Sequence, residues 1–147
     1  MALNNKLQSQ FHADIHRFPS FHAQHRKKIG PAPYFNAPSR RTSVALHRLR
    51  SGHNHLNGHR FKFDPDCQSP NCRHGCIAQE NARHVLLDCP FFDHERHPLR
   101  LLFTRLNLPF TLENVLCFND SIPKNSLLNI RYALSSFLIA SKLISIV

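Results

Sequence analysis

A chain of 147 residues suits one small domain with a tail or two very small modules, and it is too short for a complete polymerase, a TIM barrel or a two-domain dehydrogenase. The net charge of +10 is concentrated at one end, because residues 1–60 carry ten Lys or Arg and one acidic residue, whereas residues 61–147 carry nine and eight. A basic segment of this kind favours a polyanion such as nucleic acid, with an ordinary solvated tail as the alternative.

Residues 1–41 are expected to form a disordered arm that is rich in basic residues, His and Pro. Apolar residues are sparse there and follow no period, so the segment buries too little surface to offset the entropy lost on ordering. The first residues lack the apolar run of a secretory signal, which favours an intracellular protein, nuclear or cytoplasmic, over a secreted one. In a reducing compartment, clustered Cys and His residues indicate metal binding rather than disulfides.

The chain becomes more regular from residue 42 onward. Ser43 is a candidate N-cap for a short helix that ends at Gly52. A second short segment runs up to Pro65, which disfavours a helix at the residue before it. In that segment Phe61 and Phe63 alternate with two basic residues, a pattern that suits either stacking on unpaired bases or packing in a core.

Three further helices are expected in the C-terminal half, over about residues 96–106, 111–117 and 126–146. In the first, the apolar residues from Leu99 to Leu106 recur at the spacing of one helix face, and Arg96 is placed off that face. The last helix is apolar, but its uncharged run is far shorter than the roughly 20 residues that span a bilayer, so it is expected to pack inward or dock on a partner. These elements predict a mostly α fold class, a small helical domain organised around a zinc knuckle.

The knuckle is expected within residues 66–90, where Cys72, Cys76, His84 and Cys89 form a Cys-x3-Cys-x7-His-x4-Cys pattern. Zn²⁺ prefers four tetrahedral nitrogen and sulfur ligands, commonly Cys2His2 or Cys3His. Cys67 is the alternative to Cys72 in this set, and His74 is a further candidate. With four protein ligands the site is closed, which indicates a structural metal ion and a fold that depends on it.

Two local features are expected to shape this knuckle. Gly75 allows the positive φ that the first turn of the knuckle needs. His84 and Cys89 are five residues apart, so an ideal helix would point them about 140° apart, and the helix is expected to end between them. Pro90 supports an extended Cys89, and the apolar residues between the two ligands are expected to anchor the knuckle to the core.

Two stretches of the chain carry a family resemblance. Residues 46–59 read LHRLRSGHNHLNGH, and residues 69–90 run from SPNC to ENARHVLLDCP. They resemble the RLRTGH…LNAH and SPxC…C…E(T)AEHxLLxCP segments near the C-terminus of non-LTR (LINE-like) retrotransposon reverse transcriptases, and the resemblance covers about residues 42–147. That family usually has Cys-x2-Cys, one residue closer than here, so Cys76 matches its pattern least.

The resemblance implies a non-catalytic part of a larger RNA-directed DNA polymerase polyprotein. The polymerase motif Tyr-x-Asp-Asp is absent from the sequence, and the nine acidic residues show no set spaced for an RNase H or endonuclease site. In the intact family protein this region is implicated in handling template RNA or target DNA. The implied function is a zinc-stabilised nucleic-acid-binding module with RNA or single-stranded DNA as its partner. No membrane association is expected, because the uncharged run of the last helix is too short to span a bilayer.

The candidate nucleic-acid contacts are basic residues in and beside the family segment: Arg40, Arg41, Arg48, Arg50, His53, His59 and Arg60. Arginines would bind phosphates without regard to sequence, so affinity is expected to fall steeply with salt. The alternative is a structural or protein-interaction module that docks on a reverse transcriptase domain through its C-terminal helix, or a truncated fragment with no independent role. A zinc-dependent enzyme is the remaining hypothesis, and it would need an open, three-ligand site.

Overall fold

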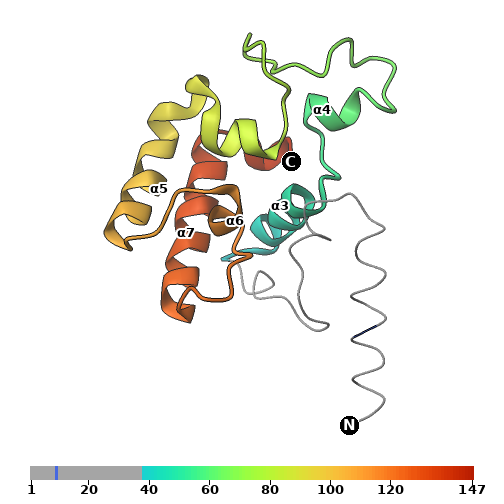
Figure 1. Ribbon diagram of the computed structural model, residues 1–147. Helices are drawn as coiled ribbons and strands as arrows, with labels where there is room; N and C mark the ends of the chain where they lie inside the picture. Colours follow the sequence, from blue (N-terminus) through green and yellow to red (C-terminus); the bar gives the residue numbers. More distant parts are fainter. Residues whose placement is uncertain (1–8, 10–37) are drawn as a thin grey trace.

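Helices account for most of the regular structure in the computed structural model, which describes Ser9 and residues 38–147. The α-helices are α3 (Arg40–Ser51), α4 (Asn57–Arg60), α5 (Asp93–Arg105), α6 (Leu112–Val115) and α7 (Lys124–Ala140) (Figure 1). Three short turns add to them: the π-helical η2 (His84–Asp88) and the 3-10 turns η3 (Pro90–Phe92) and η4 (Leu143–Ser145). Over the described residues no β-strand forms, and the only extended pairing is an isolated bridge between Asn71 and Gln79. The expected mostly helical fold is confirmed. Of the arm expected over residues 1–41, the structure describes only Ser9 and residues 38–41.

The helix α3 begins earlier than expected because Ser39, not Ser43, caps it. The Ser39 hydroxyl accepts a hydrogen bond from the Thr42 N–H at 3.1 Å, one of the donors that the first turn of a helix leaves without an intrahelical acceptor. The helix ends where Gly52 adopts a φ of 78° and donates its N–H to Arg48 O at 3.0 Å. The predicted end at Gly52 is therefore confirmed.

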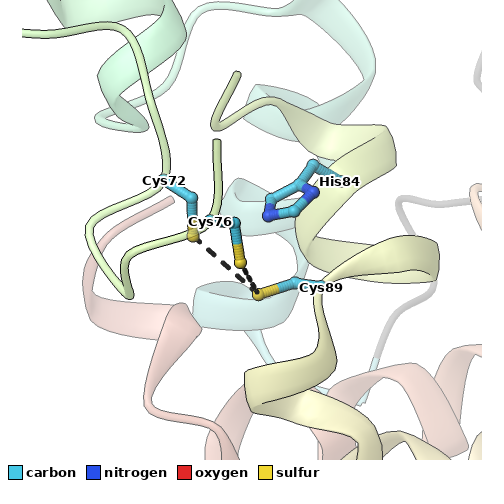
Figure 2. Close-up of side chains that lie close together, drawn as sticks. All are labelled: Cys72, Cys76, His84 and Cys89. Atoms are coloured by element: carbon cyan, nitrogen blue, oxygen red, sulfur yellow. Dashed lines mark hydrogen bonds between the residues drawn. The ribbon is translucent and has the colours of Figure 1, made fainter. Parts of the chain in front are cut away.

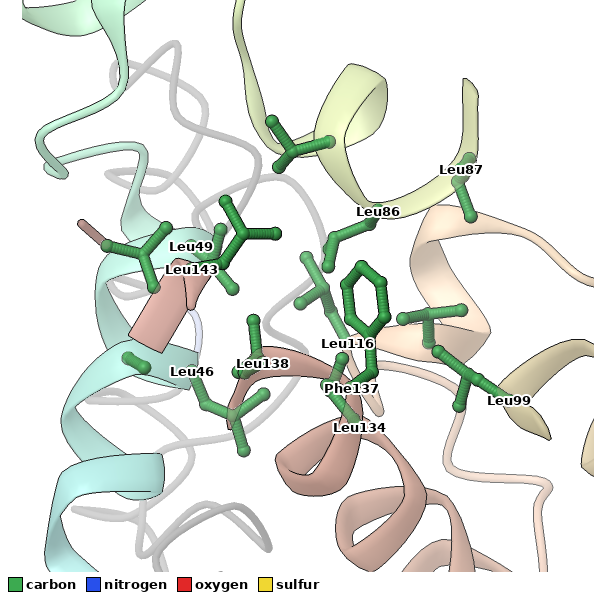
Figure 3. Close-up of a cluster of buried hydrophobic side chains, with 14 of the residues drawn as sticks. Leu46, Leu49, Leu86, Leu87, Leu99, Leu116, Leu134, Phe137, Leu138 and Leu143 are labelled. Carbon is green, nitrogen blue, oxygen red and sulfur yellow. The ribbon is translucent and has the colours of Figure 1, made fainter. Parts of the chain in front are cut away.

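The helix α7 lies at the centre of the fold, with α5 packed along one side and α3 on the other (Figure 1). A buried contact of 2.7 Å between the hydroxyls of Thr42 and Ser135 joins α3 to α7. Several elements supply large apolar side chains to one core. Burial of each such side chain stabilises the folded state by about 1.5–3 kcal/mol. The labelled members of this core in Figure 3 are Leu46, Leu49, Leu86, Leu87, Leu99, Leu116, Leu134, Phe137, Leu138 and Leu143.

Helix boundaries in the C-terminal half differ from those predicted. The helix α5 begins at Asp93, before the predicted residue 96, and its acidic first turn suits the positive end of the helix dipole. The helix α6 is shorter than the predicted 111–117, because Cys117 adopts a positive φ of 59°. The predicted helix over 126–146 is two elements, since Lys142 at a φ of 61° separates α7 from η4.

The helix α7 turns its apolar face inward, which is one of the two arrangements expected for the last helix. Leu127, Ile130, Leu134 and Leu138 on this face are buried. Among the described residues, no helix has both the length and the apolar character needed to cross a bilayer. The apolar character of α7 is therefore explained largely by its place in the core.

Candidate metal centre

Four side chains from two separate segments converge beside the core: Cys72, Cys76, His84 and Cys89 (Figure 2). Their ligand atoms all lie within 4.8 Å of one another, and three of the four residues are buried while Cys76 is half-buried. The Sγ atom of Cys89 is 3.8 Å from that of Cys72 and 3.8 Å from that of Cys76, too far for a disulfide, whose S–S distance is about 2.05 Å. These four residues, the ligand set ranked first from the sequence, could hold one metal ion.

A short turn places Cys72 and Cys76 on one side of the site. Gly75 has a φ of 86°, so the positive φ expected at this residue is confirmed. Its N–H donates to Cys72 O at 3.1 Å, and the chain then runs back so that the Cys72 N–H donates to Ala78 O at 3.0 Å. These two hydrogen bonds fix the relative position of the two thiols.

His84 begins η2 and Cys89 directly follows its end, so one widened helical turn separates the two ligands. The Cys89 N–H donates to His84 O at 2.7 Å, the i→i−5 bond of a π-helical turn. An ordinary helix would point the two side chains about 140° apart, whereas the wider turn brings residue i+5, Cys89, back over residue i, His84. The helical turn nevertheless ends at Asp88, so the expected helix end between the two ligands is confirmed, and what the sequence did not predict is the π-helical form of that last turn. The extended Cys89, with a ψ of 118°, and the burial of residues 85–87 are confirmed.

The His84 ring brings a nitrogen into the site that no described group satisfies. Its Nε2 atom is buried and has no hydrogen-bond partner among the described residues. Buried polar atoms in proteins are almost always paired, and an unpaired one costs about 1–3 kcal/mol. The backbone N–H of His84 donates to Asn81 Oδ1 at 2.9 Å, so the residue is positioned without using Nε2. A metal ion between the imidazole and the thiols would satisfy this nitrogen.

The surroundings of Cys89 favour the protonated form of its thiol. Burial, together with the neighbouring thiols of Cys76 and Cys72, raises the pKa of Cys89 to about 12. A metal ligand has to be a thiolate, so a metal ion that binds here displaces thiol protons. Its affinity is therefore expected to fall as the pH falls.

Arg96 on α5 supports η2 from behind, a role that sequence reasoning missed. Its guanidinium is fully buried and donates from Nη2 to Cys89 O at 2.7 Å and to Val85 O at 3.2 Å. The prediction that Arg96 lies off the apolar face of α5 is wrong, because Arg96, Leu99 and Phe103 are buried on one face at the spacing i, i+3, i+7. This spacing could have predicted that Arg96 is buried, but a charged residue was assigned to the exposed side of the helix.

Glu80 holds the metal loop, defined as residues 70–83, against α4. Its buried carboxylate accepts hydrogen bonds from the Asn57 N–H at 2.7 Å and from the Arg73 guanidinium at 2.7 and 2.8 Å. Burial acts to raise the pKa of Glu80, but the hydrogen bonds from Arg73 and Asn57 outweigh it and lower the pKa below its usual value. The Gly58 N–H donates to Glu80 O at 3.0 Å, and a Cβ on Gly58 would lie 2.7 Å from that oxygen, so this approach requires glycine. Sequence reasoning missed Glu80 as well, since no periodicity marks it as buried.

The remaining cysteines and His74 lie outside the ligand cluster. Cys67, the alternative to Cys72, has its thiol hydrogen-bonded to a backbone carbonyl at 3.4 Å, and the structure does not bring it into the set. The His74 ring stacks on Phe91 with 3.7 Å between ring centres. Cys117 is a buried thiol, as expected.

The candidate nucleic-acid contacts divide into exposed and half-buried residues. Arg40, Arg41 and Arg48 are exposed on α3, and His53 is exposed just beyond its end. His59 and Arg60 are half-buried in α4. Arg60 forms an ion pair with Asp64 at 2.6 Å, so its charge is already neutralised locally.

Arg50 is the exception among these candidates because it points into the protein. It is 4% exposed and donates to Leu116 O at 2.9 Å. Its guanidinium carbon also lies 3.8 Å from the centre of the Phe118 ring. The expectation that Arg50 contacts nucleic acid is therefore wrong, since its position on α3 faces the core.

Comparison of the chain with protein-family models, with curated proteins and with solved structures found no match. The resemblance to retrotransposon reverse transcriptases thus depends on the motif residues alone.

Proposed function

We propose that the chain is a non-catalytic, zinc-stabilised module that binds nucleic acid, either RNA or single-stranded DNA. Three thiols and an imidazole suit Zn²⁺, whereas Mg²⁺ and Ca²⁺ prefer oxygen ligands. At a Zn–S distance of about 2.3 Å, a tetrahedral ion separates its sulfur ligands by about 3.8 Å. Both sulfur–sulfur distances to Cys89 are 3.8 Å, so a zinc ion would fit with little movement of the chain.

The number of ligands supports a structural rather than a catalytic metal ion. Four protein ligands leave no coordination position for water or substrate. Residues 85–87, which lie between His84 and Cys89, are buried in the core, so metal binding would be coupled to folding. The motif resemblance supports the same role, because the family's polymerase, RNase H and endonuclease parts lie elsewhere in its polyprotein.

The exposed arginine face of α3 is the observation that carries the nucleic-acid proposal. Arg40, Val44 and Arg48 recur every four residues and so share one side of the helix, with Arg41 beside them. These residues line a hollow of about 520 Å³. Arg48 Nη1 donates to Val147 O at 3.0 Å, whereas residues 38–63 contain no Asp or Glu that would neutralise Arg40 and Arg41 from within this segment. A surface of this kind attracts phosphates irrespective of sequence.

Anisotropy of a labelled single-stranded oligonucleotide, measured at several salt concentrations, tests this proposal. We expect the affinity to fall steeply with salt, and the slope of log K against log salt to decrease by about 0.7 for each of Arg40 and Arg41 that is replaced by Gln. Arg105→Gln changes an exposed arginine on α5 and is the control, which should leave the slope unchanged. Absence of salt-dependent binding below about 10 µM contradicts the proposal.

A second candidate function, docking on another protein, is favoured by the outer face of α7. Leu128, Tyr132 and Ile139 share one side of the helix and are 41%, 54% and 59% exposed. In the family that the motifs resemble, the partner would be a reverse transcriptase domain. A monomer in size-exclusion chromatography that binds oligonucleotide and little apolar dye supports the first function. Self-association and strong dye binding without oligonucleotide binding support the second.

A further inference from the structure

A row of three rings runs along α4, from the exposed His53 before it, through the half-buried His59 within it, to the exposed Phe63 in the turn that follows it. The His59 ring packs edge-on against His53 and Phe63, with ring centres 5.3 and 4.9 Å apart. His59 Nδ1 is 2.8 Å from Asn54 O, and because a carbonyl only accepts, Nδ1 carries the proton and the ring is held in place. Phe63 ends the row and is 60% exposed. Its exposure excludes the core packing considered for this residue.

A hollow of about 270 Å³ opens beside these rings, between the end of α3, α4 and the metal loop. His59 and Lys62 both line it. Arg60 on the same turn is neutralised by Asp64 at 2.6 Å, whereas Lys62 forms no ion pair with any residue that the structure describes. Arg83 also lines the hollow but pairs with Asp88 at 3.4 Å, so Lys62 is the lining cation that remains available to a phosphate.

We propose that His59, Lys62 and Phe63 bind an unpaired base of a single-stranded nucleic acid, with the base stacked on the exposed Phe63 ring and an adjacent phosphate at Lys62. This inference rests on the proposed nucleic-acid function. It identifies the surface that would make the protein bind single strands more tightly than a duplex. Any base has a π-face that stacks on an aromatic side chain. A duplex keeps its bases stacked internally and presents only phosphates to Lys62.

Phe61 provides a comparison within the same turn. It is 50% exposed, yet it makes no ring contact within the described part of the chain. Residues two apart on a helical turn point to different sides, so Phe61 does not continue the row of His53, His59 and Phe63. Of these two phenylalanines, only Phe63 contacts the ring of His59, which lines the hollow.

The metal loop determines where this surface lies. The N–H groups of Asn57 and Gly58 in α4 donate to Glu80, at 2.7 and 3.0 Å. Since His59 follows them directly, a change that loosens Glu80 also displaces the rings. Binding of single strands is therefore expected to require the metal ion, because the metal loop holds the rings in position. The attraction of phosphates to the basic residues does not depend on that position.

Equilibrium binding to oligo(dT), to oligo(U) and to a duplex of equal charge tests the proposal with the metal-loaded protein. We expect Phe63→Ala to weaken binding of single strands about 5- to 100-fold and to leave duplex binding within about twofold. Phe61→Ala is the matched control and should change neither. Lys62→Gln should lower the salt slope by about 0.7. Tighter binding of oligo(U) identifies RNA as the source of the base, and tighter binding of oligo(dT) identifies DNA.

The outcomes separate this inference from the function on which it rests. If Phe63→Ala binds single strands as the wild type does, or if Phe61→Ala loses as much affinity, the assignment to this surface is overturned. A wild-type protein that binds neither single strands nor duplex overturns the proposed function itself. Circular dichroism and metal content verify the fold of each variant, and Phe63→Tyr, which keeps a ring, should retain single-strand binding.

Discussion

Replacing Glu80 with Gln removes one buried charge and turns one acceptor into a donor, with almost no change in shape. One carboxylate oxygen accepts from Arg73 Nε at 2.7 Å, and the other accepts from the Asn57 N–H at 2.7 Å and from Arg73 Nη2 at 2.8 Å. Whichever way the amide of Gln is turned, its NH₂ group faces a guanidinium donor. At least one charge-assisted hydrogen bond is therefore lost.

We expect Glu80→Gln to lower the free energy of unfolding by about 2–4 kcal/mol at pH 7, because a hydrogen bond to a charged group contributes about 1.5–3 kcal/mol and a buried group left unpaired costs about 1–3 kcal/mol. The Arg73 side chain is 30% exposed, so solvent screens part of its charge and keeps the loss below the sum of these contributions. A small domain has a total stability of about 5–15 kcal/mol, so the change is readily measured.

The difference between wild type and Glu80→Gln also depends on pH with a definite sign. Burial acts to raise the pKa of Glu80, but the hydrogen bonds from Arg73 and Asn57 outweigh it, so the folded pKa lies below the ordinary 4.5. The unfolded chain then takes up the proton more readily than the folded protein. The stability that the carboxylate contributes is fully present above the unfolded pKa and is lost as the pH falls through the folded pKa. The two proteins should therefore converge in stability below pH 4.5.

Urea unfolding of both metal-loaded proteins, from neutral pH into the acid range in the same buffers, measures this difference. Loss of metal in acid affects both proteins, so the difference between them isolates Glu80. Asp120→Asn removes an exposed loop carboxylate and should change the stability by no more than about 0.5 kcal/mol. A Glu80→Gln protein as stable as wild type, or a difference that persists unchanged into acid, would refute the role assigned to Glu80.

Two further substitutions test the neighbours of the metal ligands. Gly58→Ala should destabilise the protein by about 1–3 kcal/mol in urea, because its Cβ would lie 2.7 Å from Glu80 O; wild-type stability would contradict that close approach. Arg96→Met should weaken zinc binding about 10- to 100-fold in a chelator competition, because Cys89 O loses a donor at 2.7 Å. Unchanged zinc affinity would show that Arg96 does not support the ligands.

The ligand set could be predicted from the sequence because a metal knuckle is specified locally. The types and spacing of Cys72, Cys76, His84 and Cys89 and the conformational preference of Gly75 are all readable in one short stretch. The π-helical turn could not be predicted, because its geometry depends on Arg96 from another helix and on burial of residues 85–87. The spacing of Arg96 marks it as a residue of the buried face, but it does not show which backbone carbonyls the guanidinium contacts.

The predicted exposure of Arg50 and the predicted ends of two helices were wrong for different reasons. Arg50 follows Leu46 by four residues, so helical spacing places both on the inner face of α3, and grouping the arginines by charge concealed that position. Cys117 and Lys142 end or separate helices with φ values of 59° and 61°. Residues other than Gly seldom adopt this conformation, so no sequence signal marked these two positions.

Zinc content and folding with and without a chelator test the central claim most directly. We predict one zinc ion per chain, and loss of the helical circular dichroism signal on chelation that Zn²⁺ restores and Mg²⁺ does not. Cys72→Ser, Cys76→Ser, His84→Ala and Cys89→Ser should each lose the ion, whereas Cys67→Ser should keep it. A protein that remains folded and free of zinc in the presence of chelator would contradict the claim that a metal ion organises this fold.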